Sequence, residues 1–135
     1  MKKNNFHTTS HSKHLLQCHL VFSVKYRKKI LNGFLADDLK QIMFDIANDR
    51  NIIIKAMQTD EDHIHLMIDY PPTKSVLEMV NNFKSISTNR IYKKHKTFLK
   101  SHFWKENVLW SDGYFVCSIG EASPDTIKKY IDNQG

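Results

Sequence analysis

The segment of residues 62–69 constrains this chain more than any other, because its apolar and polar residues alternate. Such alternation predicts a β-strand with one face in the core and one polar face. Side chains two residues apart on a strand point to the same side, roughly 6.5–7 Å apart along the backbone. The two sets are Ile64, Leu66 and Ile68 on one side, and His63, His65, Met67 and Asp69 on the other. The two imidazoles can therefore bind one metal ion together, although an ordinary polar strand face would also explain them.

The C-terminal residues predict a helix with a second pair of reactive side chains. Ser123 is a good N-cap, and Pro124 suits the first helical position. Tyr130 and Gln134 are four residues apart and share a helix face. A tyrosine hydroxyl can act as a nucleophile, and an amide oxygen one turn away can bind a metal. The same spacing would also suit a face that only packs the helix against the protein.

Taken together, these segments resemble a known family. His63-Ile64-His65 is similar to the histidine–hydrophobic–histidine (HUH) motif, and residues 130–134 are similar to the tyrosine helix of single-tyrosine HUH transposases, the insertion sequence 200/605 family. The resemblance runs from about residue 15 to the end. Its other matching segments are His19-Leu20-Val21-Phe22, Lys25-Tyr26-Arg27, Asn82-Phe83-Lys84-Ser85, and Trp110 before Gly113-Tyr114-Phe115-Val116.

The resemblance implies an enzyme that cleaves and rejoins single-stranded DNA carrying hairpins at the ends of a mobile element. Tyr130 would form a 5′-phosphotyrosine, and His63, His65 and Gln134 would hold a divalent metal, Mg²⁺ or Mn²⁺. Strand exchange needs two tyrosines, so the resemblance also implies a homodimer. Two alternatives stay open: a related tyrosine transposase that acts on repeated chromosomal hairpins, and a ferredoxin-like nucleic-acid-binding module without catalysis.

Length and composition predict one domain. The chain has 135 residues, of which 41% are hydrophobic, enough for a core. We assign residues 1–14 to a flexible polar leader and residues 15–135 to a single HUH catalytic domain. No apolar run approaches the ~20 residues of a membrane helix, so we expect no membrane association. Cys18 and Cys117 fall in apolar strand patterns and are expected as free thiols in a reducing, prokaryotic cytoplasm.

The net charge of +6 suits a polyanionic partner. Basic and aromatic residues are interleaved, which is typical of proteins that bind single-stranded nucleic acid, although a solvated basic face would look similar. From charge and position we select the following candidates for DNA contact: Arg27, Lys28, Lys84, Ser87 and Arg90.

The order of elements predicts an α+β fold. Half-buried strands and amphipathic helices follow one another as β-α-β-β-α-β, with a final helix that bears the tyrosine. This is the ferredoxin-like (split βαβ) antiparallel sheet, with helices on one face. Residues 108–119 predict a hairpin around residues 111–113, and residues 95–107 give no clear prediction. His19 falls on the polar side of the first strand, where it could be a third ligand, a group that supports a ligand, or only a neighbour.

Overall fold

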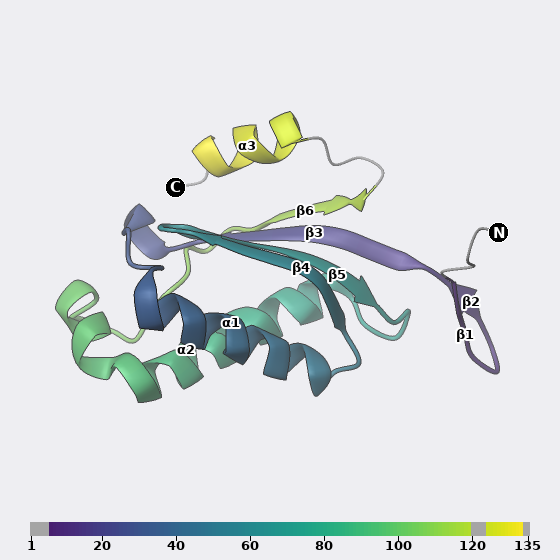
Figure 1. The fold of residues 1–135 in the computed structure, drawn as a ribbon, viewed down its shortest axis with the longest axis horizontal. Helices are drawn as coiled ribbons and strands as arrows, with labels where there is room; N and C mark the ends of the chain where they lie inside the picture. Colours follow the sequence, from purple (N-terminus) through teal and green to yellow (C-terminus); the bar gives the residue numbers. More distant parts are fainter. Residues whose placement is uncertain (1–5, 120–123, 134–135) are drawn as a thin grey trace.

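The computed structural model of the chain describes residues 6–119 and 124–133. One antiparallel sheet holds four strands in the order β4 (Ile53–Asp60), β5 (His63–Tyr70), β3 (Leu16–Ser23) and β6 (Phe115–Ser118). Helices α1 (Gly33–Asn48) and α2 (Val76–His102) cover one face, and α3 (Pro124–Asn133) lies over the other (Figure 1). The predicted ferredoxin-like order is confirmed, with β3 and β5, the first and third of the four strands along the chain, in the centre.

The core forms between the sheet and the helix pair α1–α2. The alternation predicted for β5 is observed, since Ile64, Leu66 and Ile68 are fully buried there. In register, Leu66 lies opposite Leu20 of β3, which is also fully buried. The helices contribute buried side chains at helical spacing, namely Leu39, Met43 and Ile46 from α1 and Met79, Val80 and Phe83 from α2. This burial fixes which side of the sheet is left for chemistry.

Helix α2 begins where the sequence predicts and continues to His102, into the region for which the sequence makes no clear prediction. The Ser75 side chain accepts a hydrogen bond of 3.0 Å from the Glu78 backbone N–H, which satisfies a donor at the helix start. The helix then runs through His95, whose backbone angles are not helical, and the His95 ring lies 2.6 Å from a carboxylate oxygen of Asp38 on α1. No helix in the described ranges is long and apolar enough to cross a membrane.

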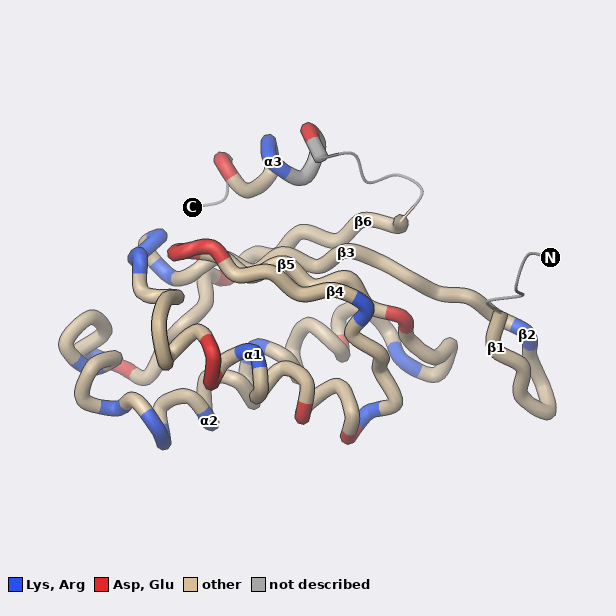
Figure 2. The backbone as a smooth tube through the Cα atoms, viewed as in Figure 1, with Lys and Arg blue, Asp and Glu red and all other residues tan. Residues whose placement is uncertain are grey.

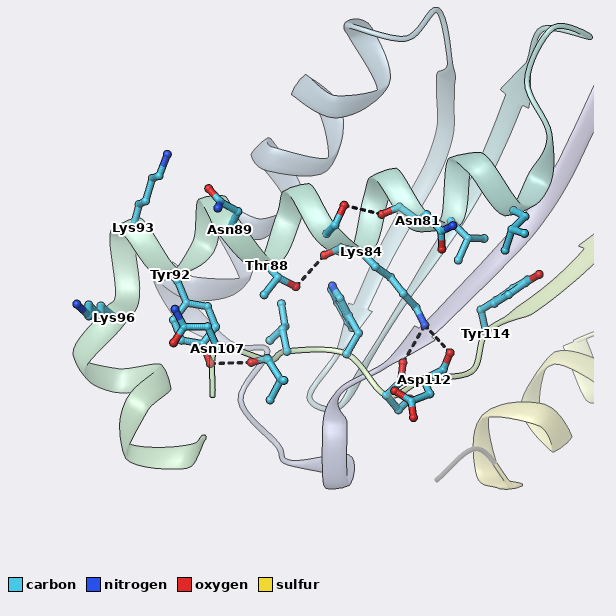
Figure 3. A pocket seen from close by; sticks show the side chains of 17 residues that line it. Asn81, Lys84, Thr88, Asn89, Tyr92, Lys93, Lys96, Asn107, Asp112 and Tyr114 are labelled. Carbon is cyan, nitrogen blue, oxygen red and sulfur yellow. Dashed lines mark hydrogen bonds between the residues drawn. The ribbon is translucent and has the colours of Figure 1, made fainter. Parts of the chain in front are cut away.

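The predicted hairpin around residues 111–113 is wrong. Trp110 pairs antiparallel with Val24, and β6 pairs antiparallel with β3, so both segments run in the same direction along one neighbour. Residues 111–114 interrupt this line as a loop. Lys84 of α2 holds the loop, because its Nζ donates to the carbonyls of Ser111 and Asp112 at 2.8 and 3.1 Å (Figure 3) and to the carbonyl of Gly113 at 2.8 Å.

The N-terminal segment carries more structure than a flexible leader requires. Strands β1 (His7–Thr8) and β2 (Lys13–His14) pair as a small separate sheet. The ring of His7 contacts the carboxylate of Asp69 at the end of β5, with Nε2 at 2.9 Å from Oδ1. Flexibility over residues 1–14 stays a prediction, but this contact ties the described part of the segment to the sheet.

Helix α3 is attached to the open face by an arginine. The short 3-10 helix η1 (Lys25–Arg27) follows β3, and Arg27 Nη1 donates 2.6 Å to the backbone carbonyl of Ile131. The Nε and Nη2 atoms of the same guanidinium lie 3.1 Å from Oδ2 of Asp62, in the turn before β5. Arg27 therefore joins α3 to the edge of the central strand pair.

We predict that Lys84→Met destabilises the fold. The ammonium group donates to three carbonyls, and burial lowers its pKa, partly countered by Asp112. A hydrogen bond from a charged donor contributes about 1.5–3 kcal/mol, so we expect a loss of about 1–3 kcal/mol in the free energy of unfolding, measured with urea. The exposed Lys93 on the same helix is the matched control, and equal losses in Lys84→Met and Lys93→Met would contradict the structural role.

We predict that Arg27→Ala loosens α3. Removal of the guanidinium leaves the Ile131 carbonyl and the Asp62 carboxylate without this donor, so amide exchange across residues 124–133 should become faster, by about tenfold for one lost charged hydrogen bond. Hydrogen–deuterium exchange measures this directly. The neighbouring exposed Lys29 serves as the control, and unchanged exchange in Arg27→Ala would show that other contacts hold the helix.

Candidate active site on the open face of the sheet

The two histidines of β5 lie side by side on the open face, as the alternation predicts. Both are half-buried, whereas their strand neighbours Ile64 and Leu66 face the core. The His63 Nδ1 atom lies 3.0 Å from Oδ1 of Asp62. The His65 Nε2 atom lies 2.7 Å from Nδ1 of His19 on β3, and one of these two nitrogens donates to the other. This cluster therefore contains three imidazoles and one carboxylate.

The electrostatics of the site favour neutral imidazoles beside an ionised carboxylate. Burial lowers the pKa of His65, and the neighbouring His19 and His63 lower it further. Burial also lowers the pKa of His19. Burial alone would raise the pKa of Asp62, but the hydrogen bond with His63 and the charge of Arg27 outweigh it and lower that pKa. Neutral imidazole is the form that binds metals.

A cavity of about 660 Å³ opens between this face and α3. Its floor comes from β3, β4 and β5, and its other walls come from η1 and α3. The described residues that line it are His19, Arg27, Gln58, Thr59, Asp60, Asp62, His63, His65, Lys128, Ile131 and Asp132. The mixture of imidazoles, carboxylates and two basic side chains suits a ligand that carries both phosphate and a bound cation.

Tyr130 lies on α3 but is not among the described residues that line this cavity. Its hydroxyl donates 2.7 Å to the carbonyl of Tyr114, and its ring lies 4.6 Å, centroid to centroid, from the ring of Phe115 on β6. Lys128 and Asp132 of the same helix do line the cavity. The structure thus places the predicted nucleophile on the open face, but it does not bring the hydroxyl to the histidines of the same chain.

The predicted metal ligands are partly placed. His63 and His65 share the cavity, whereas Gln134 lies outside the described residues. Within the described ranges, no three His, Cys, Asp or Glu side chains are arranged to hold a metal ion together. Two imidazoles with a nearby carboxylate nevertheless form a donor set that suits Mn²⁺ or Mg²⁺ once a further oxygen is supplied.

The five residues predicted to contact DNA lie in different parts of the structure. Arg27 lines the histidine cavity, and Lys28 lies 6.0 Å from the ring of Phe103. Arg90 on α2 lies 3.9 Å from Asp49. Ser87 is completely buried and accepts a hydrogen bond of 2.9 Å from the Trp110 indole, so DNA cannot reach it in this conformation. Lys84, as described above, holds the loop of residues 111–113.

A second cavity lies between α2 and the segment of residues 107–114, with a volume of about 920 Å³ (Figure 3). Amides, hydroxyls and lysines line its polar side, including Asn81, Asn89 and Lys93. It contains no histidine and, among the described lining residues, a single carboxylate, that of Asp112. Of these two cavities, only the smaller gathers groups able to bind a metal, and it holds both histidines of β5, so we place the chemistry there.

Sequence reasoning missed Lys128 and Asp132 as lining residues of the site. They are four residues apart and share a helix face. That spacing was visible, but it competed with the equally spaced pair Tyr130 and Gln134 on another face. Local spacing alone cannot decide which of two polar faces of a helix turns toward the sheet.

Comparison with known proteins identifies the family of this chain. The family model for IS200-like transposases matches residues 12–134. The transposase of ISDra2 from Deinococcus radiodurans is 34% identical over 119 residues, which cover 88% of this chain and 84% of that protein. The IS200 transposase of Salmonella typhimurium is 26% identical, covering 93% of this chain and 80% of the relative.

Solved structures agree with the fold. A crystal structure from Deinococcus radiodurans R1, assigned as a transposase, superposes with a TM-score of 0.84 at 30% identity and covers 99% of this chain and 98% of its own. A REP-associated tyrosine transposase bound to a REP hairpin shares the fold at 12% identity, with a TM-score of 0.55 and coverage of 93% and 69%. The chain belongs to the IS200-like transposase family, whose members transfer DNA strands.

Proposed function

We propose that this chain cleaves and rejoins single-stranded DNA through a covalent bond to Tyr130. One observation carries the proposal: two imidazoles lie side by side on the open face of the sheet, and the helix that bears Tyr130 crosses that same face. A non-catalytic binding module has no need for this combination. The relative whose structure holds a DNA hairpin supports DNA hairpins as the substrate class of this chain too.

The reaction balances without an external energy source. The Tyr130 oxygen forms a bond to the 5′ phosphorus, and the bond from phosphorus to the 3′ oxygen breaks. The phenolic proton leaves to solvent, and the 3′ oxygen takes up a proton. A 3′ hydroxyl can later attack the phosphotyrosine and reverse the exchange, so the phosphodiester energy is kept. An unperturbed phenol has a pKa near ~10 and needs activation to act as a nucleophile.

His63 and His65 would hold a divalent cation, with Gln134 proposed as a further ligand. When bound, Mg²⁺ or Mn²⁺ offsets negative charge that develops on the phosphate. Arg27 and Lys128 line the same cavity and would hold the anionic strand. Asp62 accepts from the His63 ring and from Arg27, and so would orient the first ligand.

We further propose a homodimer in which each α3 serves the histidines of the other chain. Within one chain the Tyr130 hydroxyl donates a hydrogen bond to the Tyr114 carbonyl, and other side chains of α3 line the histidine cavity. Exchange of the helices, with α3 in a different pose from the one within a single chain, would bring a tyrosine to each cavity without changing the sheet. It would also supply the two tyrosines that a complete strand exchange requires.

The first prediction from this proposed function concerns the nucleophile. Tyr130→Phe should abolish the covalent protein–DNA adduct, because only the attacking oxygen is removed, while DNA binding stays near the wild-type level. A denaturing gel after incubation with Mn²⁺ and single-stranded DNA from the flanks of the gene measures the adduct. Tyr70→Phe, on β5, is the control and should still form it. An adduct that persists in Tyr130→Phe would refute the assignment.

The second prediction concerns the metal. His63→Ala and His65→Ala should each weaken Mn²⁺ binding about tenfold or more, because each removes one of few protein donors. Titration calorimetry measures the binding without any need for cleavage. His102→Ala, at the end of α2, is the matched control. Binding that is unaltered in both site variants would place the metal elsewhere.

The third prediction distinguishes the arrangement of the helices. Tyr130→Phe and His65→Ala chains are each inactive alone. If α3 acts on the partner chain, a mixed dimer has one doubly defective site and one intact site, so cleavage returns on mixing. If α3 acts within its own chain, the mixture stays inactive. Full strand transfer by a protein that is monomeric in light scattering would instead favour the relative that acts on chromosomal hairpins.

A further inference from the structure

We propose that Tyr26 is a stacking platform for one base of the DNA strand that enters or leaves the histidine cavity. The inference rests on the proposed function only in taking single-stranded DNA as the ligand. It does not require cleavage. Tyr26 is part of η1 and is 71% exposed. Single exposed aromatic residues are common and need no explanation. Tyr26 differs from them in its backbone conformation, its neighbouring residues and the charges around its ring.

The backbone at this position is unusual. Tyr26 has φ 61° and ψ 17°, and Arg27 follows with φ 52°. Only a few per cent of non-glycine residues adopt positive φ, and a bulky side chain there indicates strain. Such strain persists where the surrounding structure imposes it, often at functional sites. Here the flanking backbone is fixed, because Lys25 N–H donates to Leu109 and Arg27 N–H donates to Val24, both at 2.8 Å.

The strained pair sends two neighbouring side chains in different directions. Arg27 turns into the histidine cavity, where it contacts Asp62 and the carbonyl of Ile131. Tyr26, one residue earlier, projects into solvent. An extended strand would also send successive side chains to opposite sides. The left-handed turn in addition ends the strand and brings Arg27 back to the turn that contains Asp62. The exposed ring therefore belongs to the residue directly before one that lines the proposed active site.

The charges around the ring suit a nucleic acid strand. Lys25 Nζ lies 5.8 Å from the centroid of the Tyr26 ring. Four basic residues occupy positions 25 to 29, and Figure 2 shows them gathered at one end of the sheet, beside the acidic turn before β5. Phosphates can pair with these cations while a base stacks on the ring, which is how proteins bind single strands with little sequence preference. In a duplex the bases are already stacked on one another, so duplex DNA does not fit this ring.

The test measures binding in EDTA, so that cleavage plays no part. The probe is a single-stranded oligonucleotide from the flank of the gene with 2-aminopurine at successive positions, and its affinity and fluorescence are recorded. We expect Tyr26→Gly to weaken binding about 5- to 100-fold and to remove the fluorescence quenching at one position. Tyr26→Phe and Tyr26→Trp, which keep a ring, should retain both. Phe44→Ala on α1, another exposed ring, should bind as the wild type does.

Thermal stability separates this role from a structural one. Glycine adopts positive φ without steric cost, so Tyr26→Gly should melt at or above the wild-type temperature while binding DNA more weakly. A clear fall in Tm with unchanged affinity would overturn the inference and make Tyr26 a structural residue. Wild-type affinity with no loss of quenching would overturn it too. Neither result affects the Tyr130 adduct, which tests the proposed function independently.

Discussion

The one-sided burial of β5 is the constraint on which the rest of the site depends. Its three aliphatic side chains are fully buried against α1 and α2, and it is paired along its length with β3 and β4. A slip of one residue would move His63 and His65 into the core and the aliphatic residues out of it. Burial of imidazoles without partners is unfavourable. The packing of the core therefore fixes the position of the two histidines on the open face.

A second constraint connects that face to the helix above it. Asp62 stands at the start of β5, and Arg27 bridges its carboxylate to the backbone of α3. The guanidinium thus stabilises the ionised carboxylate and holds the helix with the same side chain. The position of the Arg27 side chain depends on the left-handed turn at Tyr26. The strained backbone is therefore connected to the charge of the cavity and to the position of α3.

Patterns that depend on near neighbours were predictable from the sequence. Alternation located β5 and its histidines, and the cap at Ser75 located the start of α2. Contacts between distant segments were not predictable. Lys84 looked like one more surface cation, but three carbonyls from residues 111–113 surround it and turn an expected hairpin into an interrupted strand. Ser87 fits a polar helix face in the sequence, yet the indole of Trp110 covers it.

The orientation of α3 follows from helix geometry and bears on how the site is completed. Each residue turns an α-helix by about 100°, so Tyr130 is separated by about 160° around the helix from both Lys128 and Asp132. Those two side chains line the histidine cavity together with Ile131, whereas Tyr130 packs against Phe115 and donates to the Tyr114 carbonyl at a different part of the same sheet. Either α3 turns about its axis and breaks the Arg27 and Tyr114 contacts, or a second chain supplies the tyrosine. An exchanged α3 would have to lie over the cavity in a different pose, without the hydrogen bond between Tyr130 and Tyr114, and it would then supply the second tyrosine that strand exchange requires.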